Sequence, residues 1–208
     1  QLDEWSAGRA EERAARMQMA RALKHFWGKD VLKQFGVPVT DSIISGLEGR
    51  LSELPLLSGH TFSSVRILSL SDLRVPAEQI RGFVRAFPDA TEVSLRGCGL
   101  TEFLLTPNDL PALEILALQD NPLKTVDVRG MNNLKALMLG ATELSEWPMG
   151  VEDMPNLTCL DLRNSSLATL PEAFLARDEL VLNTHLGGTP LTRQTRADLK
   201  VARQRVER

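Results

Sequence analysis

The segment LEILALQDNPL, residues 113–123, carries the pattern that decides the fold of this chain. Leucine stands at its first, fourth, sixth and eleventh positions, and Asn121 stands at the ninth. A matching frame returns five more times, with starts separated by 21 to 25 residues. A repeat of this length predicts a solenoid, in which each unit buries its apolar side against its neighbours. The other copies occupy residues 65–75, 90–100, 134–144, 157–167 and 181–191.

Each frame predicts one short strand. Leu116 and Leu118, at positions four and six, are predicted to point into the core, because side chains alternate along a strand. Ala117, between them, points to the opposite face. Stacked units therefore predict an α/β leucine-rich repeat solenoid, with a curved parallel sheet on its concave face and a mixed helical and irregular convex side. The ninth residue bonds turn backbone, and Leu73 at that position predicts an irregular turn.

Residues 1–38 are predicted to form an N-terminal helical cap over the first repeat. One amphipathic helix is expected over 6–27, ending at Gly28, and a second short helix over 29–35. Arginine and lysine side chains occupy the remaining faces of the helix expected over 6–27. The alternative is a basic helix that binds a membrane surface or a calmodulin-type partner. The predicted apolar face consists of Ala15, Met19, Leu23 and either Phe26 or Trp27.

Residues 39–191 are predicted to hold the repeats, beginning with a degenerate unit at 43–55 and a loop at 56–62. Residues 192–208 are predicted to form a basic helix, either a C-terminal cap or a link to a further domain. On the convex side we expect a helix within 76–87, a turn and helix in 101–112, an extended segment in 125–133 and a brief helix at 172–177.

Composition indicates a folded globular protein of 208 residues, 43% hydrophobic and 25% charged. No apolar run is long enough for a transmembrane helix, and the start carries no secretory signal. Because the chain begins with Gln1, we expect a fragment or a processed form. Cys98 and Cys159 lie three units apart, roughly 14 Å at the spacing of stacked strands. We therefore predict free thiols and a reducing compartment such as cytoplasm.

Charge is distributed unevenly along the chain. Residues 1–40 carry a net charge of +2 and residues 192–208 carry +4, whereas residues 41–191, with 11 basic and 20 acidic side chains, carry −9. An acidic repeat body repels phosphate, which disfavours nucleic acid and favours a protein partner. The alternative is that the acidic residues only keep the solenoid dispersed in water.

No catalytic, metal or cofactor site is indicated. His25, His60 and His185 lack metal-ligand spacing, and Gly187-Gly188 is better explained as turn chemistry than as a phosphate loop. Cys159-Leu-Asp161 spells the C-x-D pattern of some bacterial cysteine ubiquitin ligases. The frame, however, places Cys159 on a strand, and the Asp161 charge opposes thiolate formation. We therefore expect no enzymatic activity from this chain.

Positions three, five and seven of the frame are predicted to line the concave face. An apolar track flanked by charges there predicts a protein-binding patch. The alternative is that single exposed apolar residues are ordinary surface. The candidate protein-binding residues are Ile67, Ser69, Glu92, Arg96, Ile115, Gln119, Met138, Asp161, Arg163 and His185.

Between about Val39 and Leu199, the texture of the repeats resembles the leucine-rich repeat region of bacterial, Pseudomonas-type effector proteins of the novel-type (NEL) ubiquitin ligase family. The stretches that carry the resemblance are Leu51-Ser-Glu-Leu-Pro55, Phe83-Val-Arg-Ala-Phe-Pro88, Leu160-Asp-Leu-Arg163, Leu167-Ala-Thr-Leu-Pro171 and His185-Leu-Gly-Gly-Thr-Pro-Leu191. The chain departs from that family in having asparagine at only one turn position.

The resemblance implies a substrate-recognition region of a secreted effector that acts in the host cytoplasm. A ligase domain with its own cysteine would follow Leu199 and is absent from these 208 residues, so no catalytic residue is carried over. The alternative function is a stand-alone leucine-rich repeat scaffold or adaptor with no enzymatic role.

Overall fold

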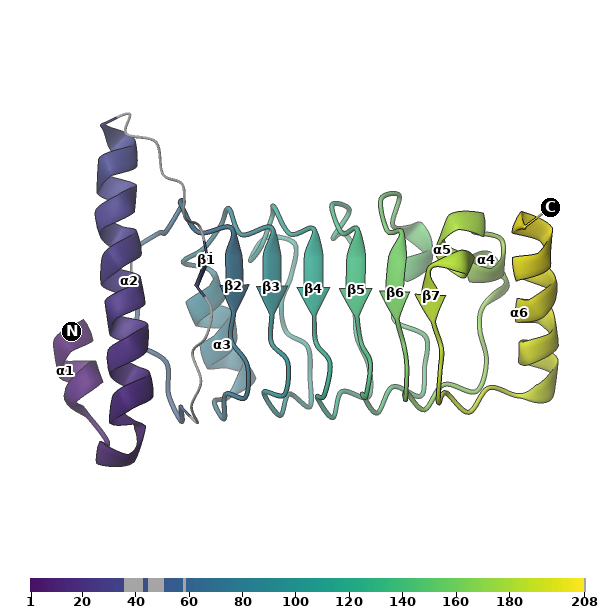
Figure 1. Ribbon diagram of the computed structural model, residues 1–208, viewed down its shortest axis with the longest axis horizontal. Coiled ribbons are helices and arrows are strands. Elements are labelled where there is room, and N and C mark those ends of the chain that lie inside the picture. Colours follow the sequence, from purple (N-terminus) through teal and green to yellow (C-terminus); the bar gives the residue numbers. More distant parts are fainter. Residues whose placement is uncertain (36–42, 45–50, 58, 208) are drawn as a thin grey trace.

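The computed structural model describes residues 1–35, 43–44, 51–57 and 59–207. Seven parallel strands form one sheet in chain order, and they lie side by side along the molecule (Figure 1). This arrangement confirms the predicted leucine-rich repeat solenoid. The strands are β1 (Ile43–Ile44), β2 (Ile67–Ser69), β3 (Glu92–Ser94), β4 (Ile115–Ala117), β5 (Ala136–Met138), β6 (Cys159–Asp161) and β7 (Thr184–His185).

The sheet stacks equivalent frame positions on each other. Leu116 of β4 is in register with Val93 on one side and Leu137 on the other. All three are fully buried, as the periodicity predicts. The leucines at position six, such as Leu118 and Leu139, are equally buried. The core is therefore a continuous row of aliphatic side chains behind the sheet, which no single unit could bury alone.

The turns after the strands share one backbone feature. The eighth residue of every frame has a positive φ of 55° to 76°, from Asp72 in the first copy to Gly188 in the last. The amide of Asp72 donates to the carbonyl of Arg96 in the next unit (2.9 Å), as Gly97 does to Gln119 (3.0 Å). The first copy keeps this bond between units, but residues 71–72 form only a bend where the other five copies form a hydrogen-bonded turn. The prediction of an irregular turn at Leu73 is therefore confirmed.

Most ninth-position side chains bond turn backbone as predicted. Asn121 makes the largest set, donating to the carbonyls of Leu95 (2.8 Å) and Leu118 (2.9 Å) and accepting from the amide of Leu100 (3.0 Å). Thr142 donates to Leu139 in the same way (2.8 Å). The Asn121 side chain thus joins two units, whereas the Thr142 hydroxyl bonds only within its own unit.

The convex side combines short helices with irregular segments. The helix expected within 76–87 is α3 (Ala77–Val84), and the brief one expected at 172–177 is α4 (Glu172–Leu175). Two further elements were not indicated by the pattern, η2 (Val151–Asp153) and α5 (Asp178–Leu182). The helical ending expected in 101–112 is wrong, because that segment contains only turns.

The N-terminal cap differs from the predicted pair of helices. A short helix α1 (Leu2–Ala7) and a 3-10 turn η1 (Ala10–Glu12) precede one continuous helix, α2 (Arg13–Gln34). Gly28 lies inside α2 rather than at its end. The buried side of α2 continues past this glycine to Asp30, and tertiary packing outweighs the roughly 1 kcal/mol that a glycine costs in a helix.

The buried face of α2 is the predicted one, with Phe26 rather than Trp27 facing the core. Arg16 departs from the prediction that arginines occupy only the exposed faces, since it is 1% accessible. Ile44, Leu51 and Leu54 of the degenerate unit are buried and continue the core toward the cap. Residues 39–42 and 45–50 of that region lie outside the described residues.

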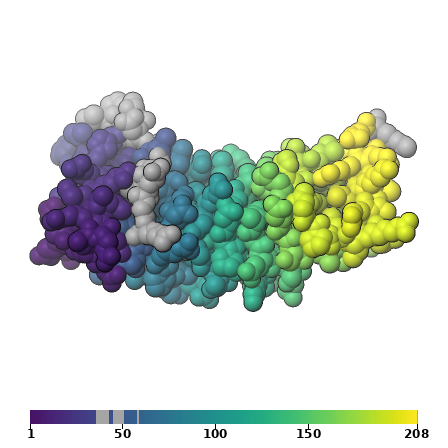
Figure 2. Space-filling model, turned by 60° about the horizontal axis from the view of Figure 1, so that its bottom comes forward, coloured from purple at the N-terminus to yellow at the C-terminus, as the bar shows by residue number. Residues whose placement is uncertain are grey.

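At the other end, α6 (Arg193–Val206) covers the last unit, at the opposite end of the elongated body from the cap (Figure 2). Its side chains Leu199 and Ala202 are buried. Arg203 donates to the carbonyl of Thr184 at the end of the sheet (2.7 Å). The predicted basic helix is confirmed. In the described part of the chain, no helix combines the length and apolar character needed to cross a bilayer.

Candidate protein-binding face

The open face of the sheet consists of columns, in which equivalent residues of neighbouring units lie side by side. Register places Ile67 beside Glu92, and Glu92 beside Ile115, in the third-position column. The fifth-position column runs through Ser69, Ser94, Ala117, Met138, Asp161 and His185. The structure thus brings seven of the ten predicted residues into two adjacent columns on one surface.

The apolar members of these columns are half-buried rather than fully exposed. Ile67, Ile115 and Met138 each lose part of their surface to neighbouring strands. Glu92 separates Ile67 from Ile115, so the apolar track is interrupted in its first half. The neighbouring residues Ala117 and Ala136 have small side chains. Ile115 and Met138 are therefore the larger apolar side chains that project from the centre of this face.

Charged side chains flank these columns and pair across units. Arg96 Nε lies 2.6 Å from the Asp120 carboxylate, and Lys135 Nζ lies 2.8 Å from Glu114. Each pair joins one unit to the next and remains largely accessible. Exposed pairs of this kind contribute little to stability, so they are free to exchange partners when another charged surface approaches.

Asp161 departs from the exposed position that periodicity predicts, since only 2% of its surface is accessible. Arg163 covers it: Nε and Nη2 donate to the two carboxylate oxygens at 2.9 and 2.8 Å, and the Arg163 amide adds a third bond at 3.0 Å. Gly140 of the preceding unit makes room, because a Cβ there would lie 3.1 Å from Asp161 Oδ2. The glycine at position 140 is the sequence feature that could have indicated a side chain of the next unit, that of Asp161, folded over this turn.

The electrostatics of this pair follow from its geometry. Burial acts to raise the pKa of Asp161, but the hydrogen bonds from the Arg163 side chain and backbone outweigh it and hold the pKa below the ordinary aspartate value. Arg163 therefore sits as a fixed, largely exposed guanidinium on the concave surface. A pre-positioned arginine loses little freedom on binding, which is why arginine is common at the centres of protein interfaces.

Four of the predicted residues meet in a polar hollow of about 210 Å³ at the edge of the concave face. Arg96 and Arg163 stand on two sides of it, with Gln119 and the turn of Gly140 between them. Gln119 Oε1 is buried there without a hydrogen-bond partner. His185 lies outside this hollow, exposed on the last strand. The full lining is Arg96, Gln119, Asp120, Gly140, Ala141, Asp161, Arg163 and Asn164.

Cys159 is poorly placed for nucleophilic chemistry. Burial, followed by the negative charge of Asp161, raises the pKa of its thiol. Asp161 is itself held by Arg163 and is not available as a base. Both Cys98 and Cys159 are free thiols, as predicted. Among the residues that the structure describes, no cluster of three or more histidine, cysteine, aspartate or glutamate side chains could hold a metal ion.

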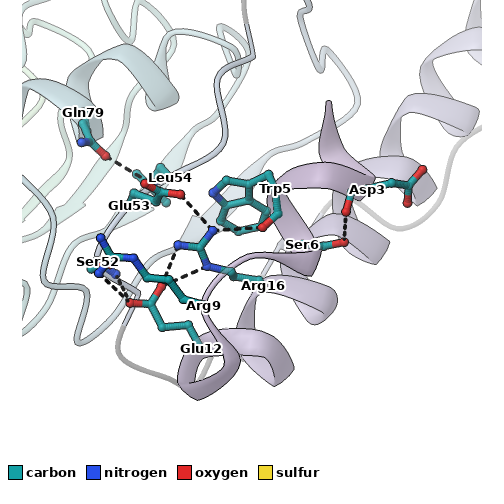
Figure 3. Close-up of polar contacts among 10 residues, drawn as sticks. All are labelled: Asp3, Trp5, Ser6, Arg9, Glu12, Arg16, Ser52, Glu53, Leu54 and Gln79. Atoms are coloured by element: carbon teal, nitrogen blue, oxygen red, sulfur yellow. Dashed lines mark hydrogen bonds and ion pairs between the residues drawn. The ribbon is translucent and has the colours of Figure 1, made fainter.

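Among the residues that the structure describes, three buried charged groups outside the concave face were not indicated by the sequence pattern. Arg16 donates to the carbonyl of Trp5 (2.9 Å), to Glu53 (2.9 Å) and to Glu12 (3.1 Å), as Figure 3 shows. Asp30 accepts from the amide of Ser64 (2.7 Å). Their partners lie 11 to 37 residues away, apart from Glu12, a range at which no local motif reveals them.

The third buried group is Asp109. It accepts from Arg81 Nε (3.1 Å), from Arg85 Nε and from the amide and hydroxyl of Thr106 (both 2.8 Å). Burial acts to raise its pKa, yet the bonds from Arg85 and Thr106 outweigh it and lower the pKa. Asp109 therefore ties α3 to the next convex segment and has a structural role.

A larger hollow of about 950 Å³ opens between α1, residues 53–57 and 59–61, and α3. Leu2 and Trp5 line one side, and Leu57 and Phe83 line the other. It belongs to the junction of cap and repeats, away from the concave columns, and no repeat position predicts it.

Comparison with known proteins supports the fold and goes no further. No protein-family model matches the chain, and none of the curated proteins compared with it matches. A solved leucine-rich repeat protein of Leptospira interrogans is similar, with a TM-score of 0.54 and 20% sequence identity. The match covers 68% of this chain and 36% of that protein. The chain thus spans about a third of that protein's length and shares its repeat architecture.

Proposed function

We propose that this chain is a protein-binding module that contacts its partner through the concave sheet. The observation that carries the proposal is the placement of Ile115 and Met138 over a floor of small residues, beside the fixed guanidinium of Arg163. Projecting apolar side chains surrounded by a polar, accessible rim are the usual arrangement in a protein interface. Paired rim charges of both signs suit a partner surface of mixed charge.

The specific role that we propose is substrate recognition for a bacterial effector ubiquitin ligase whose catalytic domain is carried elsewhere in the protein. Support comes from the order of the repeat motifs that resemble that family. Such an effector would be secreted and act in the cytoplasm of a host cell. Sequencing the parent gene past the codon for Arg208 tests this role, and a reading frame without a downstream cysteine ligase domain would contradict it.

A stand-alone scaffold is the second candidate. It is favoured by the contacts of α6, whose Leu199 and Ala202 are buried against the last unit. A helix that closes the repeat stack in this way is what a terminal cap requires. Both candidates use the concave face, and they differ only in what is joined to it.

The concave interface is tested with the double variant Met138→Glu, Arg96→Glu. Affinity capture from host-type cytosolic extract should recover a partner with the wild-type chain and lose it with the variant. We expect at least about a ten-fold loss in affinity, since interface hot spots contribute on the order of 2 kcal/mol or more. Arg96 is preferable to Arg163, because reversing Arg163 would leave the buried Asp161 carboxylate facing a second negative charge.

Val201→Glu is the matched control, since Val201 is 66% exposed on α6 at the far end. Its capture should equal that of wild type, and both variants should melt near the wild-type temperature. Undiminished capture by the double variant would place the partner on another surface and refute the concave proposal.

A further inference from the structure

The outer side of α2 and its C-cap residue Phe35 carry apolar side chains that the described structure leaves at least 41% exposed. Trp27, Val31 and Phe35 follow one another at intervals of four residues and so form one row along the helix. Leu32 lies beside this row. Their exposed fractions are 50%, 41%, 80% and 49% for Trp27, Val31, Phe35 and Leu32. A helix that is apolar on both sides normally has a second contact, and we call these four residues the α2 outer patch.

The exposed charges that α2 itself carries are all basic. The only acidic residue between Arg13 and Gln34 is Asp30, which is 7% accessible and already bonded to Ser64. Arg21, by contrast, is exposed, and so are Lys24 and Lys33, which bond Asp3 and the carbonyl of Ser63 respectively. A basic helix face thus stands on a chain whose repeat body, residues 41–191, carries a net charge of −9.

Neighbouring elements leave most of the patch open, although the ring of Trp27 packs edge-on against that of His60, with centroids 5.1 Å apart. Helix α1 lies beside the other half of α2 (Figure 1), where Arg16 bonds Trp5 and Lys24 bonds Asp3. Of the acidic side chains of the cap, Glu12 bonds Arg16 there, and Asp3 bonds Lys24, three residues before Trp27. The repeat body extends from α2 toward the opposite end of the molecule (Figure 1). The negative charge of the body therefore lies behind the helix, away from whatever meets its outer side.

We propose that the α2 outer patch binds an anionic lipid surface. Charge complementarity selects a negative partner, and exposed tryptophan, phenylalanine and leucine with surrounding lysine and arginine are the composition of helices that lie in a membrane interface. The long basic side chains can reach the headgroups while the apolar ones enter the acyl boundary. The patch is a helix ridge rather than a groove, which suits a flat deformable surface. This binding mode is independent of the proposed concave function.

Co-sedimentation of the full chain with vesicles tests the proposal. Vesicles of phosphatidylserine and phosphatidylcholine in equal parts should bind the chain at least about ten-fold more tightly than vesicles of phosphatidylcholine alone, the margin that several basic residues provide near an anionic surface. The double variant Leu32→Glu, Phe35→Glu should lose about ten-fold or more of that binding, because it removes apolar insertion and adds charge.

Two further variants keep the test decisive. Arg21→Glu changes charge without touching apolar residues, and it should also weaken binding to the anionic vesicles if the double variant fails to fold. Val201→Glu on α6 should bind as wild type does. Equal binding to both vesicle types, no binding to either, or full binding by the variants would overturn the proposal. So would a wild-type dimer that dissociates in the double variant, since the patch would then be a contact between two copies.

Discussion

In the repeat body the same strand and core contacts recur from unit to unit, whereas in the N-terminal cap each contact occurs once. Leu137 sits between Leu116 and Leu160 in register, and the same arrangement recurs from β2 to β6. The cap is joined to the body by contacts that each occur once, among them Arg16 with Glu53, Asp30 with Ser64 and Glu12 with the amide of Ser52. A repeated contact leaves a period in the sequence, and a unique one leaves no local trace.

The largest effect should come from emptying a repeated core position. Leu137→Ala should lower the free energy of unfolding by about 2–5 kcal/mol, because the fully buried side chain leaves a cavity between two stacked units. Urea unfolding followed by circular dichroism measures it. Met138→Ala, in the same strand and half-buried, should cost clearly less. Equal losses for the two variants would mean that the inward and outward sides of β5 are not as described.

A smaller and more local effect is expected in the cap. Arg16→Ala should cost about 1.5–3 kcal/mol, the range for hydrogen bonds to charged groups, because Glu12, Glu53 and the Trp5 carbonyl all lose their donor. Hydrogen exchange should show faster opening of α1 and α2 and little change in β4 to β6. Arg21→Ala, on the exposed side of α2, is the control. Uniform loss of protection along the solenoid would contradict a separately attached cap.

The stability of the repeat body should depend on pH through the Asp161–Arg163 pair, whereas the aliphatic core has no group that titrates. The pKa of Asp161 is below its ordinary value of about 3.9 in the folded chain. Its contribution to stability is therefore complete above that value and is lost as pH falls toward the folded pKa. Between pH 5 and pH 2, as a rough window around these values, wild type should lose stability more steeply than Asp161→Asn. Parallel melting curves against pH would refute the Arg163 contact.

The smallest effect should come from the polar side chain at the ninth position that makes no turn bond. Ser165 Oγ is buried and unbonded, so Ser165→Ala should change stability by no more than about 0.5 kcal/mol. Thr142→Val, which removes the bond to the Leu139 carbonyl (2.8 Å), should cost about 1 kcal/mol. If Ser165→Ala were the costlier of the two, the ninth position would depend on something other than turn bonding.

Only part of the candidate protein-binding face could be predicted from the sequence. The frame places Ile115 and Met138 correctly on the open face, because strand alternation decides this locally. The frame fails at Asp161, since its burial depends on Arg163 folding back and on Gly140 one unit earlier. The frame also has no means of indicating the α2 outer patch as uncovered, because exposure depends on where α1 stops.

Periodicity alone was sufficient for the parallel sheet, the inward leucines and the free cysteines, because every unit repeats the same short-range pattern and must bury the same side. It was insufficient for the continuous helix through Gly28 and for the buried positions of Arg16, Asp30 and Asp109. Each of these depends on bonds or packing between residues distant in the chain. Such contacts occur once, and their energies outweigh local preferences that a sequence pattern records.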